Sequence, residues 1–284
     1  MTVPAELTAI TTAEERENAL FAWLRARASV LLGFSGGVDS AYLASVAVEA
    51  LGRDRVLGVI GRSASYPEEQ WLAALDIAAR IGLRVEEVDT DEMRDSRYVA
   101  NPSNRCYFCK SELWGKLAPL ARERGLAVVV DGTNADDTGG HRPGMRAANE
   151  HGIASPLAEV GMTKRDVRER SRARGLPTWS RPSAPCLASR IQYGLHVTSE
   201  RLAQVESAER ALRELGITGD LRVRHHGDLA RIELSRDMLS RWLAPAALRT
   251  LTAAVRAAGF ARVAVDLRGF RSGSLNLFQE VNAA

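Results

Sequence analysis

The chain has 284 residues, of which 45% are hydrophobic and 26% are charged, proportions that are ordinary for a globular protein. Its 38 lysines and arginines against 35 aspartates and glutamates give a net charge of +3, too small to indicate a nucleic-acid partner. No apolar run approaches the ~18 residues of a membrane span, and the N-terminus lacks a signal-peptide pattern. Three cysteines, an odd number, argue against a disulfide framework. We therefore expect a cytoplasmic protein that uses its thiols chemically.

The first 130 residues alternate between predicted strands and predicted helices. A helix ending near Arg27 comes first, with Thr12 as its N-cap. Apolar runs predict strands at residues 28–34, 56–61 and 126–130, a further strand is expected at 84–88, and the segments between them predict helices at residues 41–51, 67–81 and 111–124. Such alternation is typical of an α/β fold, here a doubly wound and mostly parallel sheet whose ligands collect beyond the carboxyl ends of the strands.

The second half of the chain changes character. Residues 139–146 are rich in glycine and basic side chains and show no helical period, so we expect a loop. The segment Thr163-Lys164-Arg165-Asp166 has the form of a capping box and predicts a helix. A helix at 198–215, alternating strands at 221–225 and 229–235, two helices separated at Pro245 and a strand at 261–267 predict a smaller C-terminal α+β unit. The predicted domains are residues 1–193 and 194–284.

The segment Ser35-Gly36-Gly37-Val38-Asp39-Ser40 joins the first predicted strand to the next helix. A strand, a glycine turn and a helix N-terminus aim several backbone N–H groups at one point, which suits phosphate. Gly36 and Gly37 leave room for an oxyanion and allow positive φ, while Ser35 and Ser40 add hydroxyl donors. Because no lysine follows, the segment is not a Walker A loop, and we expect Asp39 to hold Mg²⁺ on a triphosphate instead. A chance glycine turn is the alternative.

The S-G-G-x-D-S pattern resembles the PP-loop of the ATP pyrophosphatases, whose fold is of the adenine nucleotide alpha hydrolase type. The resemblance implies a loop that grips the β,γ-pyrophosphate of ATP while a substrate oxygen is adenylylated. Arg62 and Ser63 follow the second strand and are placed to touch adenine and ribose. Asp131 and Thr133 follow the fourth strand, in a turn that lines the nucleotide pocket in this superfamily. The alternatives are a polar loop at the first place and a helix cap at the second.

The three cysteines are the second informative feature. Cys106 and Cys109 form a C-x-x-C pair just before the predicted helix at 111–124, and Cys186 lies in a loop stiffened by neighbouring prolines. A C-x-x-C pair alone fits a redox couple, half a zinc site or two core residues. Structural zinc normally takes four protein ligands, and histidines are available for that role. Three thiols without a fourth suit a [4Fe-4S] cluster with one open iron.

Six segments together resemble the LarE family, the sulfur transferases of nickel-pincer nucleotide biosynthesis. They are S-G-G-V-D-S, R-C-Y-F-C-K, D-G-T-N-A-D-D, A-P-C-L-A-S-R, R-V-R-H-H-G-D-L-A-R-I-E and G-F-R-S-G-S-L-N. The likeness runs from Val30 to Asn276. It implies that ATP adenylylates a carboxylate of a pyridinium biscarboxylate mononucleotide, and that sulfur then displaces AMP to give a thiocarboxylate.

The family has two branches that differ in the sulfur source. In one, the cysteine of the P-C-L-x-S-R loop, here Cys186, donates its own sulfur and becomes dehydroalanine. In the other, this cysteine and a C-x-x-C pair hold a [4Fe-4S] cluster that carries a transferable sulfide. The chain has all three thiols and resembles the cluster branch, which implies Cys106, Cys109 and Cys186 as metal ligands. The catalytic residues implied are Cys186 and Asp39, and the sacrificial role of Cys186 stays open.

The substrate carries a phosphate of its own, which needs a basic site separate from the ATP loop. Arg222 and Arg224 alternate on one predicted strand and therefore project from the same face, where we expect them to bind phosphate with the assistance of His225 and Arg190. A solvated strand face is the alternative. The expected partners are the mononucleotide substrate, further copies of the chain, and sulfide or a protein that supplies sulfur.

Two other functions compete with this interpretation. One is a PP-loop tRNA thiolase, some of which also use three cysteines and a cluster. The chain has only three lysines and no aromatic-interleaved basic surface in its C-terminal unit, which argues against a tRNA partner. The other is a nucleotide-binding redox sensor without catalysis, which would gain nothing from a loop that releases pyrophosphate.

Overall fold

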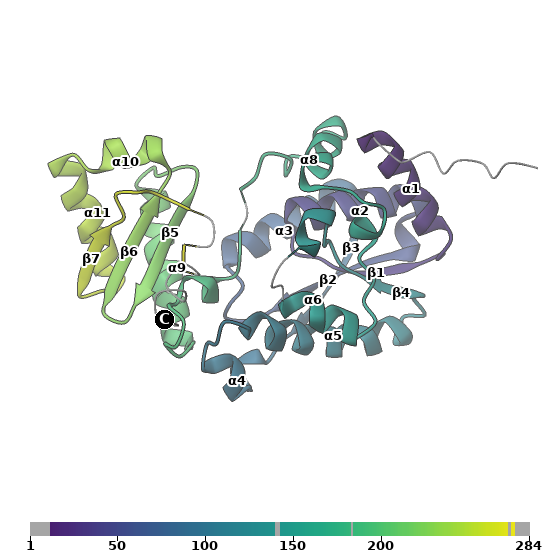
Figure 1. The fold of residues 1–284 in the computed structure, drawn as a ribbon, viewed down its shortest axis with the longest axis horizontal. Helices are drawn as coiled ribbons and strands as arrows, with labels where there is room; N and C mark the ends of the chain where they lie inside the picture. Colours follow the sequence, from purple (N-terminus) through teal and green to yellow (C-terminus); the bar gives the residue numbers. More distant parts are fainter. Residues whose placement is uncertain (1–11, 140–142, 183, 272–273, 276–284) are drawn as a thin grey trace, which may run out of the picture. The chain divides into compact units, whose positions relative to one another are not determined.

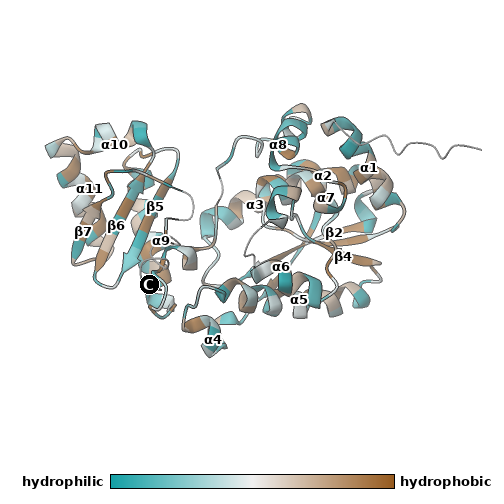
Figure 2. Cartoon of the chain, viewed as in Figure 1, coloured by the Kyte–Doolittle hydropathy of each residue, from teal (hydrophilic) through white to brown (hydrophobic). Residues whose placement is uncertain are grey.

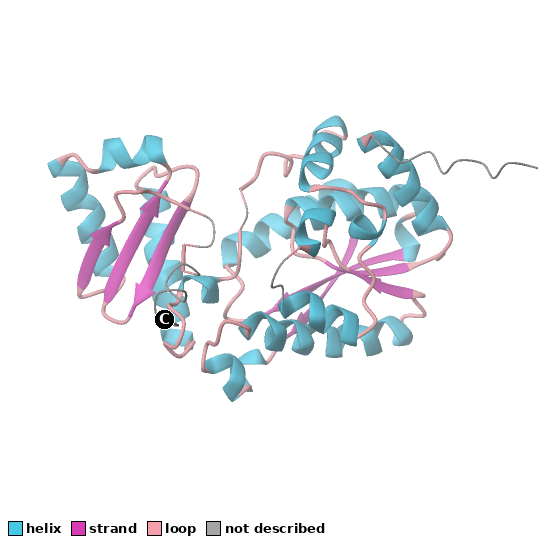
Figure 3. Ribbon diagram, viewed as in Figure 1, coloured by secondary structure: helices cyan, strands magenta, loops and turns pink. Residues whose placement is uncertain are grey.

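The computed structural model describes residues 12–139, 143–182, 184–271 and 274–275. The chain divides into two compact units. The first unit comprises residues 1–62, 69–90 and 110–181, and the second comprises residues 63–68, 91–109 and 182–284. The second unit therefore includes two short segments from the N-terminal half of the chain. Each unit has its own β-sheet, drawn in magenta in Figure 3.

The first unit is built on a parallel sheet with the strand order β3-β2-β1-β4. Its strands are β1 (Val30–Gly33), β2 (Val56–Arg62), β3 (Arg84–Asp89) and β4 (Val128–Val130). Val30, Leu31 and Leu32 of the central strand β1 are fully buried, as expected for a strand that is covered on both faces. The predicted α/β fold with a doubly wound parallel sheet is confirmed.

Helices cover both faces of this sheet, with α2 and α3 on one face and α5 and α6 on the other (Figure 1). The helices are α1 (Ala13–Arg25), α2 (Val38–Leu51), α3 (Glu68–Ile81), α5 (Arg105–Glu123), α6 (Pro143–Glu150), α7 (Pro156–Glu159) and α8 (Lys164–Ala173), and residues 105–109 of α5 are counted in the second unit. Figure 2 shows the apolar strands in brown at the centre of this arrangement. In the described part of the chain, no helix has both the length and the apolar character needed to cross a bilayer.

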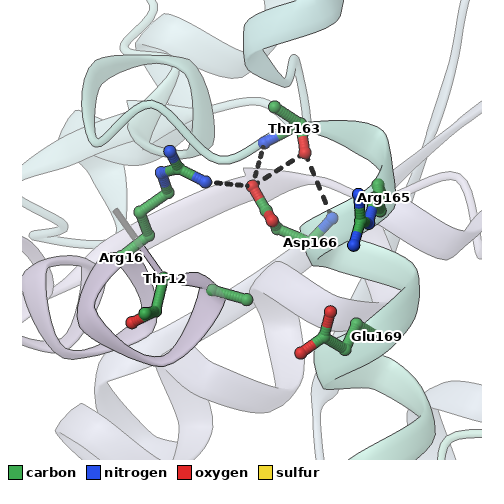
Figure 4. A pocket seen from close by; sticks show the side chains of 7 residues that line it. Thr12, Arg16, Thr163, Arg165, Asp166 and Glu169 are labelled. Carbon is green, nitrogen blue, oxygen red and sulfur yellow. Dashed lines mark hydrogen bonds and ion pairs between the residues drawn. The ribbon is translucent and has the colours of Figure 1, made fainter. Parts of the chain in front are cut away.

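Helix starts in the first unit follow local sequence rules. Thr12 and Thr163 are the N-caps of α1 and α8, and each forms a capping box with an acidic residue three positions later, as the sequence predicts for Thr163. Asp166 of the second box also accepts a hydrogen bond of 2.8 Å from Arg16 of α1 (Figure 4). The prediction of a loop throughout 139–146 is wrong from Pro143 onward, because proline begins α6 at a position where its missing N–H is harmless. Residues 140–142 lie outside the described residues.

The second unit contains a smaller mixed sheet with the strand order β5-β6-β7. β5 (Leu221–His226) and β6 (Leu229–Leu234) form an antiparallel hairpin, and β7 (Arg262–Val265) pairs with β6 in parallel. The helices of this unit are α4 (Ser96–Val99), α9 (Ser199–Glu214), α10 (Arg236–Trp242) and α11 (Pro245–Ala257). One face of the sheet is apolar and belongs to a core that includes Val205 of α9 and Leu251 of α11. The opposite face carries arginines and a glutamate.

His225 lies on the apolar side of β5 and is only 2% exposed, so the expectation that it assists Arg222 and Arg224 in binding phosphate is wrong. Its Nε2 forms a hydrogen bond of 3.0 Å with Gln204, and its ring meets Phe260 edge-on. Burial lowers the pKa of His225 from 6.5 to about 4, with further lowering by Arg201. The folded unit therefore holds this imidazole neutral at pH values where the unfolded chain protonates it.

We expect the free energy of unfolding of the second unit to decrease as the pH falls from 6.5 to about 4, because only the unfolded chain gains a proton at His225 in this range. Urea unfolding at several pH values measures the effect. The His225→Gln variant should show a weaker pH dependence in this range, whereas His196→Gln, which removes an exposed histidine of the same unit, should behave like the original chain. An equal slope in the His225 variant would contradict the prediction.

Candidate functional site

The loop between β1 and α2 has the geometry of an oxyanion cradle. Gly36 has a φ of +65°, and a Cβ there would lie 2.5 Å from the Cβ of Ala74 in α3, so only glycine fits. Gly37 has a φ of −73° and caps α2, and a Cβ there would meet only Ser35 Oγ at 3.4 Å. The protein itself therefore requires glycine at position 36, and the open space at position 37 is left for a ligand.

Two hydroxyls shape this loop from inside. Ser35 Oγ and Ser40 Oγ are 3.1 Å apart, and Ser40 Oγ also accepts a bond of 3.3 Å from the backbone N–H of Ser35. The turn after β4 packs closely on the same place, because a Cβ at Gly132 would lie 3.0 Å from the backbone nitrogen of Ser40. The sequence-predicted serines, glycines and Asp39 are therefore assembled at the carboxyl end of the sheet, next to the turn after β4.

Asp39 is the point where distant parts of the first unit meet. Its carboxylate forms an ion pair with Lys164 and accepts a bond of 3.4 Å from Nδ2 of Asn134. The backbone N–H of Lys164 donates to Asp136 at 2.8 Å, and Asn134 Nδ2 also donates to Asp137 at 2.8 Å. A cluster of carboxylates, an amide and one ammonium thus lies beside the loop, where it can hold both Mg²⁺ and a polyphosphate.

Sequence reasoning missed Lys164 and Asn134 as site residues. Lys164 follows Asp39 by 125 positions and was interpreted only as part of a capping box. The sequence does contain one indication of this role. Lys164 lies in the first turn of a helix, where a positive charge interacts unfavourably with the helix dipole, so a nearby negative partner is expected. That partner is the carboxylate of Asp39. Lys164 therefore places a positive charge beside the glycine loop, which contains no lysine.

Asp131 and Thr133 bind each other within the turn after β4. Asp131 accepts bonds from the Thr133 N–H at 3.0 Å and the Thr133 hydroxyl at 2.8 Å, and from Ser155 at 2.8 Å. Both side chains are half-buried. These contacts order the turn that packs on α2.

Arg62 ends β2, and its guanidinium lies 3.8 Å from the ring centre of Trp71 and 3.8 Å from Glu87. Ser63 is counted in the second unit, where its Oγ accepts a bond of 3.2 Å from the N–H of Ser65. Arg62, the last residue of the strand, and Ser63, the next residue, therefore belong to different compact units.

All three cysteines lie in the second unit, and all are reduced. Cys106 is exposed on the first turn of α5, and Cys109 is half-buried one turn later. The expectation that the pair precedes the helix is wrong, because α5 begins at Arg105 rather than near residue 111. Cys186 is half-buried and directly precedes a 3₁₀ turn, Leu187–Arg190. Among the described residues, no group of three or more Cys, His, Asp or Glu is arranged to hold a single metal ion.

Tyr98 and Tyr193 each lie near two of the three thiols. Burial raises the pKa of Tyr98, and the nearby Cys186 and Cys109 raise it further. Burial also raises the pKa of Tyr193, with Cys106 and Cys186 adding to the effect. Cys109 and Cys186 both pack against the apolar core of the unit. The segment that carries Cys186 is held by a bond of 2.8 Å from the Leu187 N–H to the Ser65 carbonyl.

The three predicted phosphate-binding arginines lie in the same unit and are buried. Arg190 makes two bonds of 3.0 Å to Glu209 and one of 3.1 Å to the carbonyl of Cys186. Arg224 makes bonds of 3.0 and 2.8 Å to Glu233, which is itself fully buried. Arg190 therefore also fixes the backbone at Cys186.

Arg222 shares the polar face of β5 with Arg224, as the alternation predicts, and is only 5% exposed. Burial is the main cause that lowers the pKa of Arg222 to about 10, and the positive charges of Arg190 and Arg224 contribute to this lowering. The three guanidinium groups therefore lie close enough to influence one another.

Comparisons with known proteins identify the family. A pyridinium-3,5-bisthiocarboxylic acid mononucleotide synthase of Lactiplantibacillus plantarum is 34% identical over 265 residues, covering 93% of this chain and 95% of that protein. The chain belongs to the LarE family. The resemblance inferred from the motifs is therefore confirmed, and as a LarE-family protein the chain is an ATP-using sulfur transferase. An uncharacterized protein of Synechocystis sp., slr1717, is 44% identical over 87% of this chain and 91% of its own length.

A shorter segment, which includes the nucleotide loop, is also similar to a second family. Residues 22–105 match the family described as NAD synthase. An NH(3)-dependent NAD(+) synthetase of Pyrobaculum aerophilum is 45% identical over 67 residues, which cover 24% of this chain and 25% of that protein. The match to the NAD synthase family includes β1, the glycine loop and α2. The segment around the nucleotide loop is thus shared with enzymes of another function.

We expect Lys164→Met to slow ATP cleavage by about 100-fold, because the charge beside the loop would no longer stabilise negative charge on the phosphates. The rate of pyrophosphate release measures the effect. Lys116→Met is a matched control, since Lys116 pairs with Glu112 on α5 and has no contact with the loop. A Lys164 variant as fast as the control would show that this lysine only pairs with Asp39.

Proposed function

We propose that this protein uses ATP to adenylylate a carboxylate of a pyridinium biscarboxylate mononucleotide and then replaces AMP with sulfur. The product is a thiocarboxylate for a nickel-pincer nucleotide cofactor. The observation that carries the proposal is the Lactiplantibacillus plantarum synthase, which matches 93% of this chain and whose name states the bisthiocarboxylic product. A carboxylate is a poor acyl donor because its oxygen leaves badly, and adenylylation supplies a good leaving group.

In the activation step, a carboxylate oxygen attacks the α-phosphorus of ATP. A P–O bond forms, and pyrophosphate leaves with the electrons of the bond that breaks. We assign the β,γ-phosphates to Ser35, Gly36, Gly37 and Ser40, because the loop combines a helix N-terminus, hydroxyls and the open space at Gly37. Asp39 is assigned to Mg²⁺, with Lys164 as the neighbouring cation.

We assign the nucleoside side of ATP to residues at the ends of β2 and β4, the two strands that flank β1. Arg62 is the last residue of β2 and Ser63 follows it, while Asp131 and Thr133 follow β4. Ligands in folds of this kind collect at the carboxyl ends of the parallel strands, which supports the assignment. The stacking of Arg62 on Trp71 holds that guanidinium in place before a ligand arrives.

In the transfer step, sulfur attacks the carbonyl carbon of the acyl-adenylate. A C–S bond forms, and AMP leaves with the electrons of the C–O bond. We assign Cys106, Cys109 and Cys186 as ligands of a [4Fe-4S] cluster. The support is that the three thiols lie in one compact unit, with Tyr98 near Cys186 and Cys109 and Tyr193 near Cys106 and Cys186, and that soft thiolates select iron–sulfur clusters. Such a cluster, when bound by three cysteines, leaves one iron open for a transferable sulfide.

The substrate phosphate is assigned to Arg190, Arg222 and Arg224. The three side chains are buried in one unit, and the charges of Arg190 and Arg224 add to the effect of burial in lowering the pKa of Arg222. Arg190 also bonds the carbonyl of Cys186, so a phosphate bound here would lie beside the cysteine segment. Positioning of this kind raises rates without acid–base chemistry.

The remaining assignments extend the same proposal. We place the enzyme in the cytoplasm, as a homo-oligomer without a membrane or nucleic-acid partner, and with sulfide or a sulfur-supplying protein as the source that reloads the cluster. Gel filtration tests the oligomer. Binding of tRNA with a steep salt dependence would favour the tRNA thiolase instead.

The reaction is tested by mixing the protein with ATP, Mg²⁺ and the pyridinium biscarboxylate mononucleotide. We expect AMP, pyrophosphate and a product in which one oxygen is replaced by sulfur. If neither AMP nor pyrophosphate forms, the proposed reaction is wrong, and a nucleotide-binding sensor becomes the better interpretation.

We expect protein purified without oxygen to be brown, with the broad absorption of an iron–sulfur cluster, because three thiols are available as ligands. Iron and acid-labile sulfide analysis measures the content per chain. Colourless protein that contains one zinc ion per chain would contradict the cluster assignment while leaving the adenylylation step intact.

A further inference from the structure

Asn101 occupies an unusual backbone position between α4 and α5. It is fully buried, and its φ of +54° places it in the left-handed region that residues other than glycine rarely adopt. Its backbone N–H donates to Tyr98 at 2.9 Å, and Pro102 follows it. A buried asparagine in this conformation persists only when its surroundings fix it, so its side-chain partners need an explanation.

The side-chain amide of Asn101 holds the segment that follows Cys186. Nδ2 donates to the backbone carbonyls of Gln192 at 2.9 Å, Leu195 at 3.0 Å and Ile191 at 3.3 Å. Two backbone bonds reinforce this contact, because Gly194 N–H donates to the Asn101 carbonyl and Val197 N–H to the carbonyl of Val99. Ile191 and Gln192 also pair with His225 of β5, so the amide of Asn101 adds to the backbone bonds that hold this segment.

The other end of the same amide holds the start of α5. Oδ1 of Asn101 accepts a hydrogen bond from Nη1 of Arg105, the first residue of the helix. Arg105 is only 4% exposed, and its guanidinium lies 5.4 Å from the ring centre of Tyr193. Cys106 directly follows Arg105, and Cys109 lies one turn further. One side chain therefore contacts both the helix that carries Cys106 and Cys109 and the segment that follows Cys186.

We infer that Asn101 is the positioning residue that fixes Cys186 relative to Cys106 and Cys109. The inference rests on the proposed function, in which the three thiols act together. Donor and acceptor ends of one planar amide impose a fixed separation on the two segments, and no contact with sulfur is required. Partners of this indirect kind set how well metal-binding side chains are oriented before the metal arrives.

Two substitutions separate this role from general stability. Asn101→Gly keeps the left-handed backbone without strain but removes both ends of the amide. Asn101→Asp keeps the shape and the acceptor for Arg105, but it turns a second acceptor toward three carbonyl oxygens. Both variants should lose the side-chain link to the segment after Cys186, while the backbone bonds from Gly194 and Val197 stay possible. Gln204→Met is the matched control, because it removes the buried bond to His225 in the same unit and touches neither cysteine segment.

The experiment uses the full chain in two states. In reduced, metal-free protein, a short bis-alkylating reagent is added, and the yield of links from Cys186 to Cys106 or Cys109 is measured by mass spectrometry. In protein reconstituted with iron and sulfide, the iron content per chain is measured. We expect both quantities to fall by about 10-fold in the two Asn101 variants and to stay unchanged in Gln204→Met, with ATP binding unchanged in all three.

Three results would overturn the inference. These are equal linking in the Asn101 variants and the original chain, an equal loss in the Gln204 control, and no linking in the original chain. A different result separates the inference from the cluster assignment. If the original chain links its thiols but takes up no iron, and the Asn101 variants still fail to link, the cluster is wrong and the role of Asn101 stands.

Discussion

Replacement of Asp39 by asparagine should reduce ATP cleavage by about 1,000-fold, which is the scale on which charge-stabilising groups act at a phosphoryl centre. The amide keeps the shape of the side chain but loses the negative charge that a hard cation requires. In the free protein the same carboxylate is paired with Lys164, so the variant also leaves that ammonium without its partner. Release of AMP and pyrophosphate in the presence of Mg²⁺ and the mononucleotide measures the loss.

A matched control for this experiment is Asp76→Asn. Asp76 lies on α3 of the same unit, where it pairs with Arg80 at 2.8 Å on an exposed face. Exposed pairs of this kind contribute little to stability, so this variant should cleave ATP at the original rate. If Asp39→Asn also retains ATP cleavage, Asp39 holds Lys164 for structural reasons, and Mg²⁺ must be bound by other groups.

The sequence predicted the first sheet well, because β1, β2 and β4 are short apolar runs between polar turns. The strand predicted at 56–61 is β2 (Val56–Arg62), and the strand predicted at 84–88 is β3 (Arg84–Asp89). The strand–turn–helix around Gly36 was also predictable, since glycine there meets both a backbone requirement and a packing requirement. Local patterns of this kind do not depend on which distant segments come together.

The start of α5 was not predictable in the same way. Residues 105–109 contain two cysteines, a tyrosine and a phenylalanine, which have modest helix propensity, so the helix was predicted only from residue 111. Tertiary contacts extend it, including the bond between Arg105 and Asn101. The pair Cys106 and Cys109 consequently lies on successive turns of a helix rather than in a loop.

Charge partners were the least predictable feature of the site. The alternation of Arg222 and Arg224 correctly placed them on one face of β5, but the sequence did not indicate that Glu233 would lie opposite. The cross-strand register pairs Arg222 with Glu233, and Arg224 bonds the same carboxylate diagonally. Lys164 reached Asp39 in the same way, through the packing of α8 against α2.

Replacement of Cys186 by alanine should abolish thiocarboxylate formation while leaving adenylylation intact. The sulfur step loses its ligand or donor, but the nucleotide loop belongs to the first unit and is untouched. The backbone at position 186 should also keep its place, because it is held through its carbonyl by Arg190 and through the next N–H by Ser65. Product analysis after a single incubation with ATP and the mononucleotide measures both steps.

The two possible sulfur sources predict different activities for the Cys109→Ala variant and different masses of the original chain after turnover. If the thiols act as cluster ligands, Cys109→Ala should stop sulfur transfer as completely as Cys186→Ala does, and the mass of the original chain should be unchanged after turnover. If Cys186 donates its own sulfur, Cys109→Ala should stay active, and the original chain should lose the mass of hydrogen sulfide at Cys186. Loss of adenylylation together with sulfur transfer in Cys186→Ala would contradict both, because the cysteine would then be needed to form the activated substrate rather than to supply its sulfur.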